Sequence, residues 1–99
     1  MSDADGPGAD APRIEFPCDY PVKIMGADED GFVELVTGIA AEHAPELQDP
    51  AVLEDAVRVR RSSGGRWASV TIVIRATGEA QLRSLFEALK ATGRIQLVL

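Results

Sequence analysis

The stretch VRVRRSSGGRWASVTIVIR, residues 57–75, decides the fold of this chain. Apolar residues alternate with polar ones on both sides of a polar, glycine-containing tip, and this period of two is typical of paired antiparallel strands. The stretch therefore predicts a β-hairpin. It also holds five arginines and no acidic residue, in a chain whose formal net charge is −6. This segment is therefore positively charged although the whole chain is negatively charged.

The two faces of this hairpin differ in character. One face carries only aliphatic residues and alanine, as a buried sheet face does: Val57, Val59, Val70, Ile72, Ile74 and Ala76. The other face carries mainly arginine, tryptophan and hydroxyl residues: Arg58, Arg60, Trp67, Ser69, Thr71, Val73 and Arg75. We expect the first face to pack in the core and the second to be solvated or functional.

A strand and a helix are expected before the hairpin. Residues 20–26 alternate between apolar and polar, which predicts a first strand that can turn sharply at Gly26. Asp28 or Asp30 is expected to cap the helix that follows, where carboxylates also meet the positive end of the helix dipole. That helix ends before Pro45. Its apolar residues recur at helical spacing: Phe32, Val36 and Ile39.

The remaining segments are a loop, a strand, a helix and a last strand. The loop covers residues 45–50, with proline at both ends, and the second strand is expected over residues 53–61. A second helix should begin at residues 77–78 and end at Gly93 in a left-handed cap. Residues 95–99 complete the pattern as a short fourth strand. The apolar stripe of the second helix consists of Leu82, Leu85, Phe86 and Leu89.

The order β-α-β-β-α-β is that of a ferredoxin-like split βαβ domain of the α+β class. Right-handed crossovers predict a four-stranded antiparallel sheet in the order 4-1-3-2, with two helices on one face. The length of 99 residues suits one domain, which we expect over residues 14–99. Residues 1–13 are rich in Gly, Pro and Asp and predict a flexible acidic tail.

Composition narrows the class of protein. Hydrophobic residues make up 45% of the chain and charged residues 26%, as in an ordinary globular protein. No basic start leads into an apolar stretch, and no run is long enough to cross a bilayer, so we expect a cytoplasmic protein without membrane contact. Cys18 and His43 are the single residues of their types, which excludes an internal disulfide and a zinc site of several such ligands. No cofactor is expected.

Several polar and turn features together resemble the YbeD-like family of small uncharacterised bacterial proteins. They are the segment FPCDYPVKIMG at residues 16–26, HAP at 43–45, RSSGG at 61–65, SVT at 69–71 and QL at 81–82. The resemblance spans Ile14 to Leu99 and implies a fold similar to ACT-type regulatory domains, without a catalytic residue to carry over. Two features depart from it: the acidic tail lies outside the match, and Gly65-Arg66 and Trp67 stand where the family often has other polar residues and a smaller aromatic residue.

The resemblance implies a binding or regulatory module. ACT-type domains hold small ligands near the loop after the first strand, which here contains Gly26, Ala27 and Asp28. Backbone amides at a helix start can bind an anion, and a glycine permits close approach. A small metabolite is therefore one candidate ligand. A turn glycine also needs no ligand, so a structural role for Gly26 remains the alternative.

A protein partner or a second copy of the chain is the other candidate for such a module. Ile95, Gln96, Leu97, Val98 and Leu99 form an apolar segment at a predicted sheet edge, which suits strand pairing or a homodimer. Alternatively, Ile95, Leu97 and Leu99 belong to the core.

The arginine-rich face predicts a contact surface made of Lys23, Arg58, Arg60, Trp67 and Arg75. Sheets of this topology can bind RNA by stacking bases on such a face, so nucleic acid or another polyanion is an alternative partner. Two observations disfavour it: the sequence pI is about 4.6, and Trp67 is one aromatic residue where such sheets use two or three. The simpler interpretation is a solvated face whose arginines protect an edge strand.

An enzyme is the least favoured class. Cys18 and His43 are expected at the same end of the domain and could approach as a nucleophile and a base. A packed thiol and a helix-terminal histidine explain the same residues. The cluster of Asp28, Glu29 and Asp30 lacks the spacing of a cation-binding loop and better suits a helix start.

Overall fold

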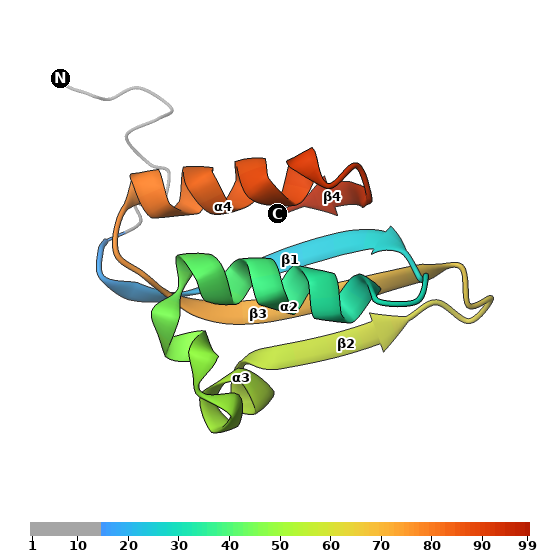
Figure 1. The fold of residues 1–99 in the computed structure, drawn as a ribbon, viewed down its shortest axis with the longest axis horizontal. Coiled ribbons are helices and arrows are strands. Elements are labelled where there is room, and N and C mark those ends of the chain that lie inside the picture. The colour runs from blue at the N-terminus through green and yellow to red at the C-terminus, as the bar shows by residue number, and fades with distance from the viewer. Residues whose placement is uncertain (1–14) are drawn as a thin grey trace, which may run out of the picture.

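The computed structural model describes residues 15–99, in which one antiparallel sheet is covered on one side by helices (Figure 1). The predicted tail of residues 1–13 lies outside the described residues. The elements in chain order are β1 (Cys18–Ala27), α2 (Phe32–His43), the 3-10 helix η1 (Pro45–Gln48), α3 (Pro50–Ala56), β2 (Val57–Arg61), β3 (Trp67–Ala76), α4 (Glu79–Ala91) and β4 (Ile95–Val98).

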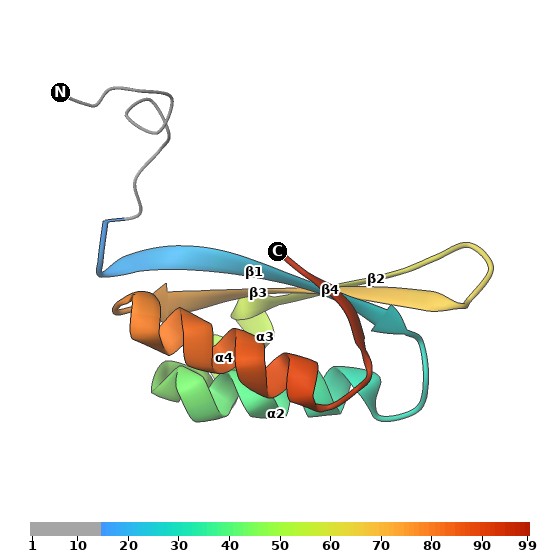
Figure 2. The same ribbon diagram turned by 90° about the horizontal axis from the view of Figure 1, so that it is seen from above.

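The sheet has the strand order β2-β3-β1-β4, which is the predicted order read from the other edge. Each neighbouring pair is antiparallel. Figure 2 shows α2 and α4 on the same side of the sheet. The predicted ferredoxin-like α+β fold is confirmed.

The core lies between the sheet and these two helices. β1 and β3 pair over their full length, from Cys18 opposite Ala76 to Ala27 opposite Trp67. The alternate residues that face the helices are fully buried along the whole of β3 and over part of β1: Val22, Ile24, Ala68, Val70, Ile72, Ile74 and Ala76. The predicted apolar stripe of α4 is also buried at Leu82, Leu85 and Leu89. Alternation and helical spacing therefore predicted the core correctly.

A third helix replaces the start of the predicted second strand. The prediction of a strand from Leu53 was wrong, because residues 50–56 form α3 and β2 begins only at Val57. The cause is a helix start at the loop's second proline: Pro50 occupies the first helical turn, and the Asp49 carboxylate accepts the backbone N–H of Ala51 at 2.9 Å. The predicted loop is itself partly helical, as η1.

The predicted cap of the first helix was also wrong. The N-cap of α2 is Gly31, with φ of 81° and no side-chain hydrogen bond, so neither Asp28 nor Asp30 caps it. Asp28 instead stays with the sheet, because its backbone N–H donates to the carbonyl of Arg66 at 2.8 Å. The helix therefore starts at Phe32, after the acidic residues 28–30 and not within them. Gly31 provides the left-handed conformation that this turn requires.

The last strand pairs with β1 through a bulge. Its register with β1 shifts between Met25 and Gly26, so that Leu97 lies opposite Met25 while Val98 lies opposite Ile24. Ile95 and Val98 therefore pack against the core, whereas Leu97 is 45% and Leu99 61% exposed. The interpretation that both leucines belong to the core was wrong, since a bulge moves later residues to the other face.

Candidate functional site

One face of the sheet carries no helix among residues 15–99. The helices α2, α3 and α4 lie on the opposite side, as Figure 2 shows. We call the uncovered side the open face. It consists of the outward-facing side chains of the four strands. Directly opposed residues of paired strands point to the same face, so the register determines which side chains meet there.

Three cations lie close together on the open face. Arg58 lies opposite Thr71, and Thr71 opposite Lys23, so these residues form one row across the sheet. Arg60 lies in the next row, opposite Ser69. Within residues 15–99, no carboxylate forms an ion pair with Lys23, Arg58 or Arg60. The structure thus brings three of the five predicted contact residues into one cluster that no carboxylate of residues 15–99 neutralises.

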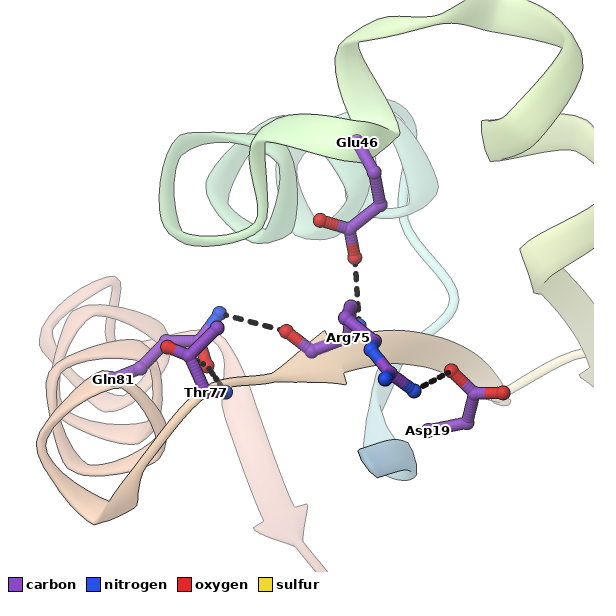
Figure 3. Close-up of polar contacts among 5 residues, drawn as sticks. All are labelled: Asp19, Glu46, Arg75, Thr77 and Gln81. Carbon is purple, nitrogen blue, oxygen red and sulfur yellow. Dashed lines mark hydrogen bonds and ion pairs between the residues drawn. The ribbon is translucent and has the colours of Figure 1, made fainter. Parts of the chain in front are cut away.

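The other two predicted residues lie at opposite ends of the open face. Arg75 forms an ion pair with Asp19 at 3.4 Å, which neutralises that end (Figure 3). Trp67 lies at the far end of β3, opposite Ala27, and its side chain is 42% exposed. A hollow of about 200 Å³ lies beside Trp67 and is lined by Met25 and Arg60 among others.

The open face also carries two exposed leucines of β4, which sequence reasoning missed. Of the five exposed large hydrophobic residues among residues 15–99, four lie on this face: Trp67, Val73, Leu97 and Leu99. Leu97 lies opposite Met25, and Leu99 exchanges two backbone hydrogen bonds with Lys23 at 2.8 and 3.1 Å. The sequence held one signal for the leucines: Gly26 within a strand pattern is typical of a bulge. The open face therefore combines an apolar side with a basic side.

The predicted ligand loop is occupied by the protein itself. A Cβ at Gly26 would lie 2.5 Å from the carbonyl oxygen of Arg94 and 2.6 Å from the ring of Phe32. The space beside Gly26 is therefore filled. The Asp28 carboxylate accepts a hydrogen bond from Nε of Arg61 at 3.0 Å. Binding of a metabolite at Gly26, Ala27 and Asp28 stays a prediction, and this packing explains Gly26 without a ligand.

The structure does not join the two residues of the hypothetical catalytic pair. Cys18 packs partly buried against the core at the start of β1. Because a carbonyl can only accept, His43 Nδ1–H donates to the carbonyl of Ile39 at 3.0 Å. No hydrogen bond links Cys18 with His43. Among residues 15–99, no group of three or more His, Cys, Asp or Glu residues is arranged to hold a metal ion.

A polar network explains several residues of the family-like motifs (Figure 3). The amide nitrogen of Gln81 donates to the carbonyls of His43 at 2.7 Å and Arg75 at 3.3 Å, while its oxygen accepts the backbone N–H of Thr77 at 2.7 Å. The carboxylate of Glu46 accepts the backbone N–H of Arg75 at 2.7 Å. The network ties α4, β3, η1 and the end of α2 together, so its role is structural.

We expect Gln81→Ala to lower the free energy of unfolding by about 2 kcal/mol, because it leaves three backbone groups without their partners. Gln48→Ala is the matched control, since Gln48 is exposed and makes one hydrogen bond of 3.4 Å to Ala41; its effect should stay below about 0.5 kcal/mol. Urea denaturation followed by circular dichroism measures both. Equal effects of the two variants would contradict the role given to Gln81.

Comparison with known proteins identifies the family. A family model described as "Protein of unknown function (DUF493)" matches residues 11–99. The chain belongs to the DUF493 family. The chain is 42% identical over 100 residues to a UPF0250 protein of Azotobacter vinelandii, with all of both chains covered. It is 43% identical over 96 residues to a UPF0250 protein of Pseudomonas aeruginosa, covering 96% of this chain and 98% of the relative. The resemblance to YbeD-like proteins is thereby confirmed.

A solved structure supports the fold of this DUF493 member. The solution structure of protein HP0495 from H. pylori aligns with a TM-score of 0.65 and 12% sequence identity, covering 99% of this chain and 98% of that one. At this identity the likeness concerns the fold alone. Within residues 15–99, no helix is both long and apolar enough to cross a membrane.

Proposed function

We propose that this protein is a non-catalytic binding module that recognises an acidic surface of a protein partner through its open face. One observation carries the proposal: in adjacent rows of the sheet, exposed apolar side chains lie beside cations that have no ion-pair partner among residues 15–99. We further propose that binding regulates the partner protein, as ACT-type domains regulate theirs. We take the partner to be cytoplasmic, as the sequence predicts.

The chemistry of the open face favours a protein as its partner. Protein interfaces combine a desolvated apolar centre with charged residues near it, and aromatic residues, methionine and arginine are enriched in them. Leu97, Leu99 and Met25 supply the apolar part, and Arg58 and Arg60 supply the charge. Since the whole chain has a net charge of −6, the rest of its surface repels an acidic partner, and the local positive cluster selects where that partner docks.

A polyanion such as RNA is the second candidate, favoured by Trp67 beside Arg60. A sheet face that binds RNA needs more than one aromatic residue on its central strands to stack the bases. The central positions of the open face are instead Lys23, Met25, Ser69 and Thr71. A protein is therefore the favoured partner of the open face, and a small metabolite or a second copy of this chain is less favoured.

Site-specific photo-crosslinking tests the proposal. A photoreactive phenylalanine analogue replaces Thr71, at the centre of the open face, or Ser84, on the exposed side of α4 as the control. In the native bacterium we expect position 71 to capture a protein that position 84 does not. The captured protein is then purified and its affinity for the full chain is measured.

The variant R58E/R60E tests how much the two arginines contribute to the affinity for the captured partner. We expect it to weaken binding of the purified partner by about 30-fold, because two attractive charges become repulsive. Wild-type affinity should fall with added salt. Unfolding of the variant is measured in parallel, and exposed substitutions should leave it nearly unchanged. Unaltered binding by the folded variant would reject the open face as the binding site.

A further inference from the structure

The outer edge of β2 has backbone groups without a strand partner among residues 15–99. β2 lies at one end of the sheet, so it pairs with β3 on one side only. The backbone N–H of Ser62 donates to the carbonyl of Trp67 at 2.9 Å, which fixes the alternation of the ladder between these strands. Because hydrogen-bonded and non-hydrogen-bonded pairs alternate, Arg58 and Arg60 direct their backbone groups toward β3. The residues whose backbone groups point outward are Val57, Val59 and Arg61.

The other free edges of the sheet are less suited to a further strand. β4 is only four residues long, and its register with β1 shifts at the bulge. β1 extends past β4 over residues 18–22. The backbone groups of Lys23 face β4, so the same alternation directs Pro21 to this free edge, where a proline has no N–H to donate. β2 contains no proline and keeps every outward donor.

The helix side of the β2 edge is largely apolar. Val57 and Val59 are partly exposed and pack against the core, while Arg61 is held by the Asp28 carboxylate. In Figure 1, α3 lies at the start of this edge, and none of the described elements runs along the rest of it. Side chains that an added strand directs to the helix side therefore meet mainly apolar neighbours. A hollow of about 430 Å³ adjoins the start of β2 and is lined by Thr37, Pro50, Leu53, Glu54 and Val57.

The open-face side of the same edge is basic. Arg58 and Arg60 are exposed there, and neither forms an ion pair among residues 15–99. We propose that the partner protein adds an extended segment beside β2 as a fifth strand of the sheet, and that acidic and apolar residues alternate in this segment. Its carboxylates lie next to the two arginines, and its apolar side chains lie next to Val57 and Val59. This inference rests on the proposed function and adds the form of the bound segment.

A second copy of this chain is a poor fifth strand at this edge. In a twofold pair of β2 strands centred on Val59, Arg58 of each copy lies opposite Arg60 of the other. Like charges directly opposite one another destabilise a sheet, whereas acidic residues at these positions stabilise it. Nucleic acid has no peptide groups to continue the ladder and would contact the arginines alone. The edge therefore favours an acidic segment of another protein.

A peptide selection tests the form of the bound segment without knowledge of the partner. Random peptides of about nine residues, which is long enough to cover β2, are displayed and selected on the full chain, then counter-selected on R58E/R60E. We expect enriched sequences to alternate Asp or Glu with β-branched or aromatic residues, at a period of two. Arg83→Glu on α4 is the control for a general charge effect and should leave the affinity of an enriched peptide unchanged.

Backbone N-methylation of an enriched peptide distinguishes strand addition from contact through side chains alone. In an added strand, every second peptide N–H donates to β2 and the others point away from it. Two peptides are compared, one methylated at two odd positions and one at two even positions. We expect one of them to lose at least about tenfold in affinity and the other less than about threefold, because only one set of N–H groups is used.

Hydrogen exchange measured by NMR on the full chain locates the added strand. Without peptide, the amides of Val59 and Arg61 should exchange faster than those of Arg58 and Arg60, which donate to β3. Saturating peptide should slow the exchange of the Val59 and Arg61 amides by at least about tenfold, because they gain hydrogen-bond partners. Contact through side chains alone would leave these two amides in fast exchange.

Several results would overturn this inference. They are a helical period in the enriched sequences, enrichment of no peptide, equal effects of the two methylated peptides, and unchanged exchange at Val59 and Arg61. Protection of these amides that rises with protein concentration alone would assign the edge to a second copy. Tighter binding of an oligothymidine strand than of any enriched peptide would assign it to a polyanion.

The proposed function is judged separately from the added strand. A photo-captured partner that depends on Arg58 and Arg60 but leaves the Val59 amide in fast exchange would keep the open face as the binding site and exclude strand addition. A partner whose affinity is the same for R58E/R60E as for the wild type would reject both.

Discussion

Gly26→Ala is expected to lower the free energy of unfolding by about 3 kcal/mol, the upper end of the usual overpacking cost. The added methyl group would lie 2.5 Å from the carbonyl oxygen of Arg94 and 2.6 Å from the ring of Phe32. Real Cβ atoms do not approach other atoms so closely, and the Arg94 carbonyl belongs to the backbone that leads into β4. The connection to β4 must therefore shift. Urea denaturation of the purified variant measures the loss.

Gly38→Ala is the matched control for this substitution. Gly38 lies within α2, and a Cβ built there has no atom within 4 Å. Alanine should therefore raise the free energy of unfolding by about 0.5–1 kcal/mol, because it favours the helix more than glycine does. Opposite signs at the two glycines are the expected result. Similar effects at both would show that the close approach at Gly26 does not govern stability.

Phe32→Ala is expected to lower the free energy of unfolding by about 4 kcal/mol. The Phe32 side chain is 1% exposed at the start of α2, where it fills the space beside Gly26. Its ring also lies 5.8 Å from the guanidinium carbon of Arg94, so truncation removes a cation–π contact as well as buried surface. Thermal unfolding should show the same order of effects as urea.

Phe86→Ala tests whether burial sets the size of this loss. Phe86 is only partly buried on α4, so its truncation should cost about 1–2 kcal/mol. The double variant Gly26→Ala/Phe32→Ala should lose less than the sum of its two single variants, because removal of the ring gives the new methyl group room on one side. Strict additivity would argue against the contact between these residues.

The sheet could be predicted because one-sided burial leaves a period of two in the sequence. In β3, Val70, Ile72 and Ile74 are buried and the residues between them face outward, as the alternation indicated. The strand order followed from the handedness of crossovers. Gly93 has the predicted left-handed φ, at 73°. These features depend on local pattern and on rules that hold for any chain.

The errors arose where local sequence permits two structures. Residues 52–56 (VLEDA) mix apolar and acidic residues without a clear period, which suits a strand or a helix, and only Asp49 followed by Pro50 signalled the helix start. The acidic residues after Gly26 resemble a helix cap, yet the hairpin holds Asp28 by its backbone N–H and its carboxylate. That contact joins segments distant in sequence, so no local pattern predicts it.

The sequence predicted the charged residues of the candidate site together with Trp67 and Val73, but it did not predict the two exposed leucines of β4. Arg58 and Arg60 face outward by simple alternation, which the sequence displays. Leu97 and Leu99 face outward because the register of β4 shifts at Met25 and Gly26. In a segment where nearly every residue is apolar, composition cannot assign the faces.

The pairing of β1 with β3 determines the order in which the domain can fold. The hairpin of β2 and β3 is local and can close within about 10 μs. β1 must instead find β3 across α2, α3 and β2, since Cys18 lies opposite Ala76, and such distant contacts form slowly. During that interval the apolar side of the hairpin is uncovered. The arginines of β2 lie on an edge strand both in the isolated hairpin and in the finished sheet, so they discourage edge-to-edge aggregation at both stages.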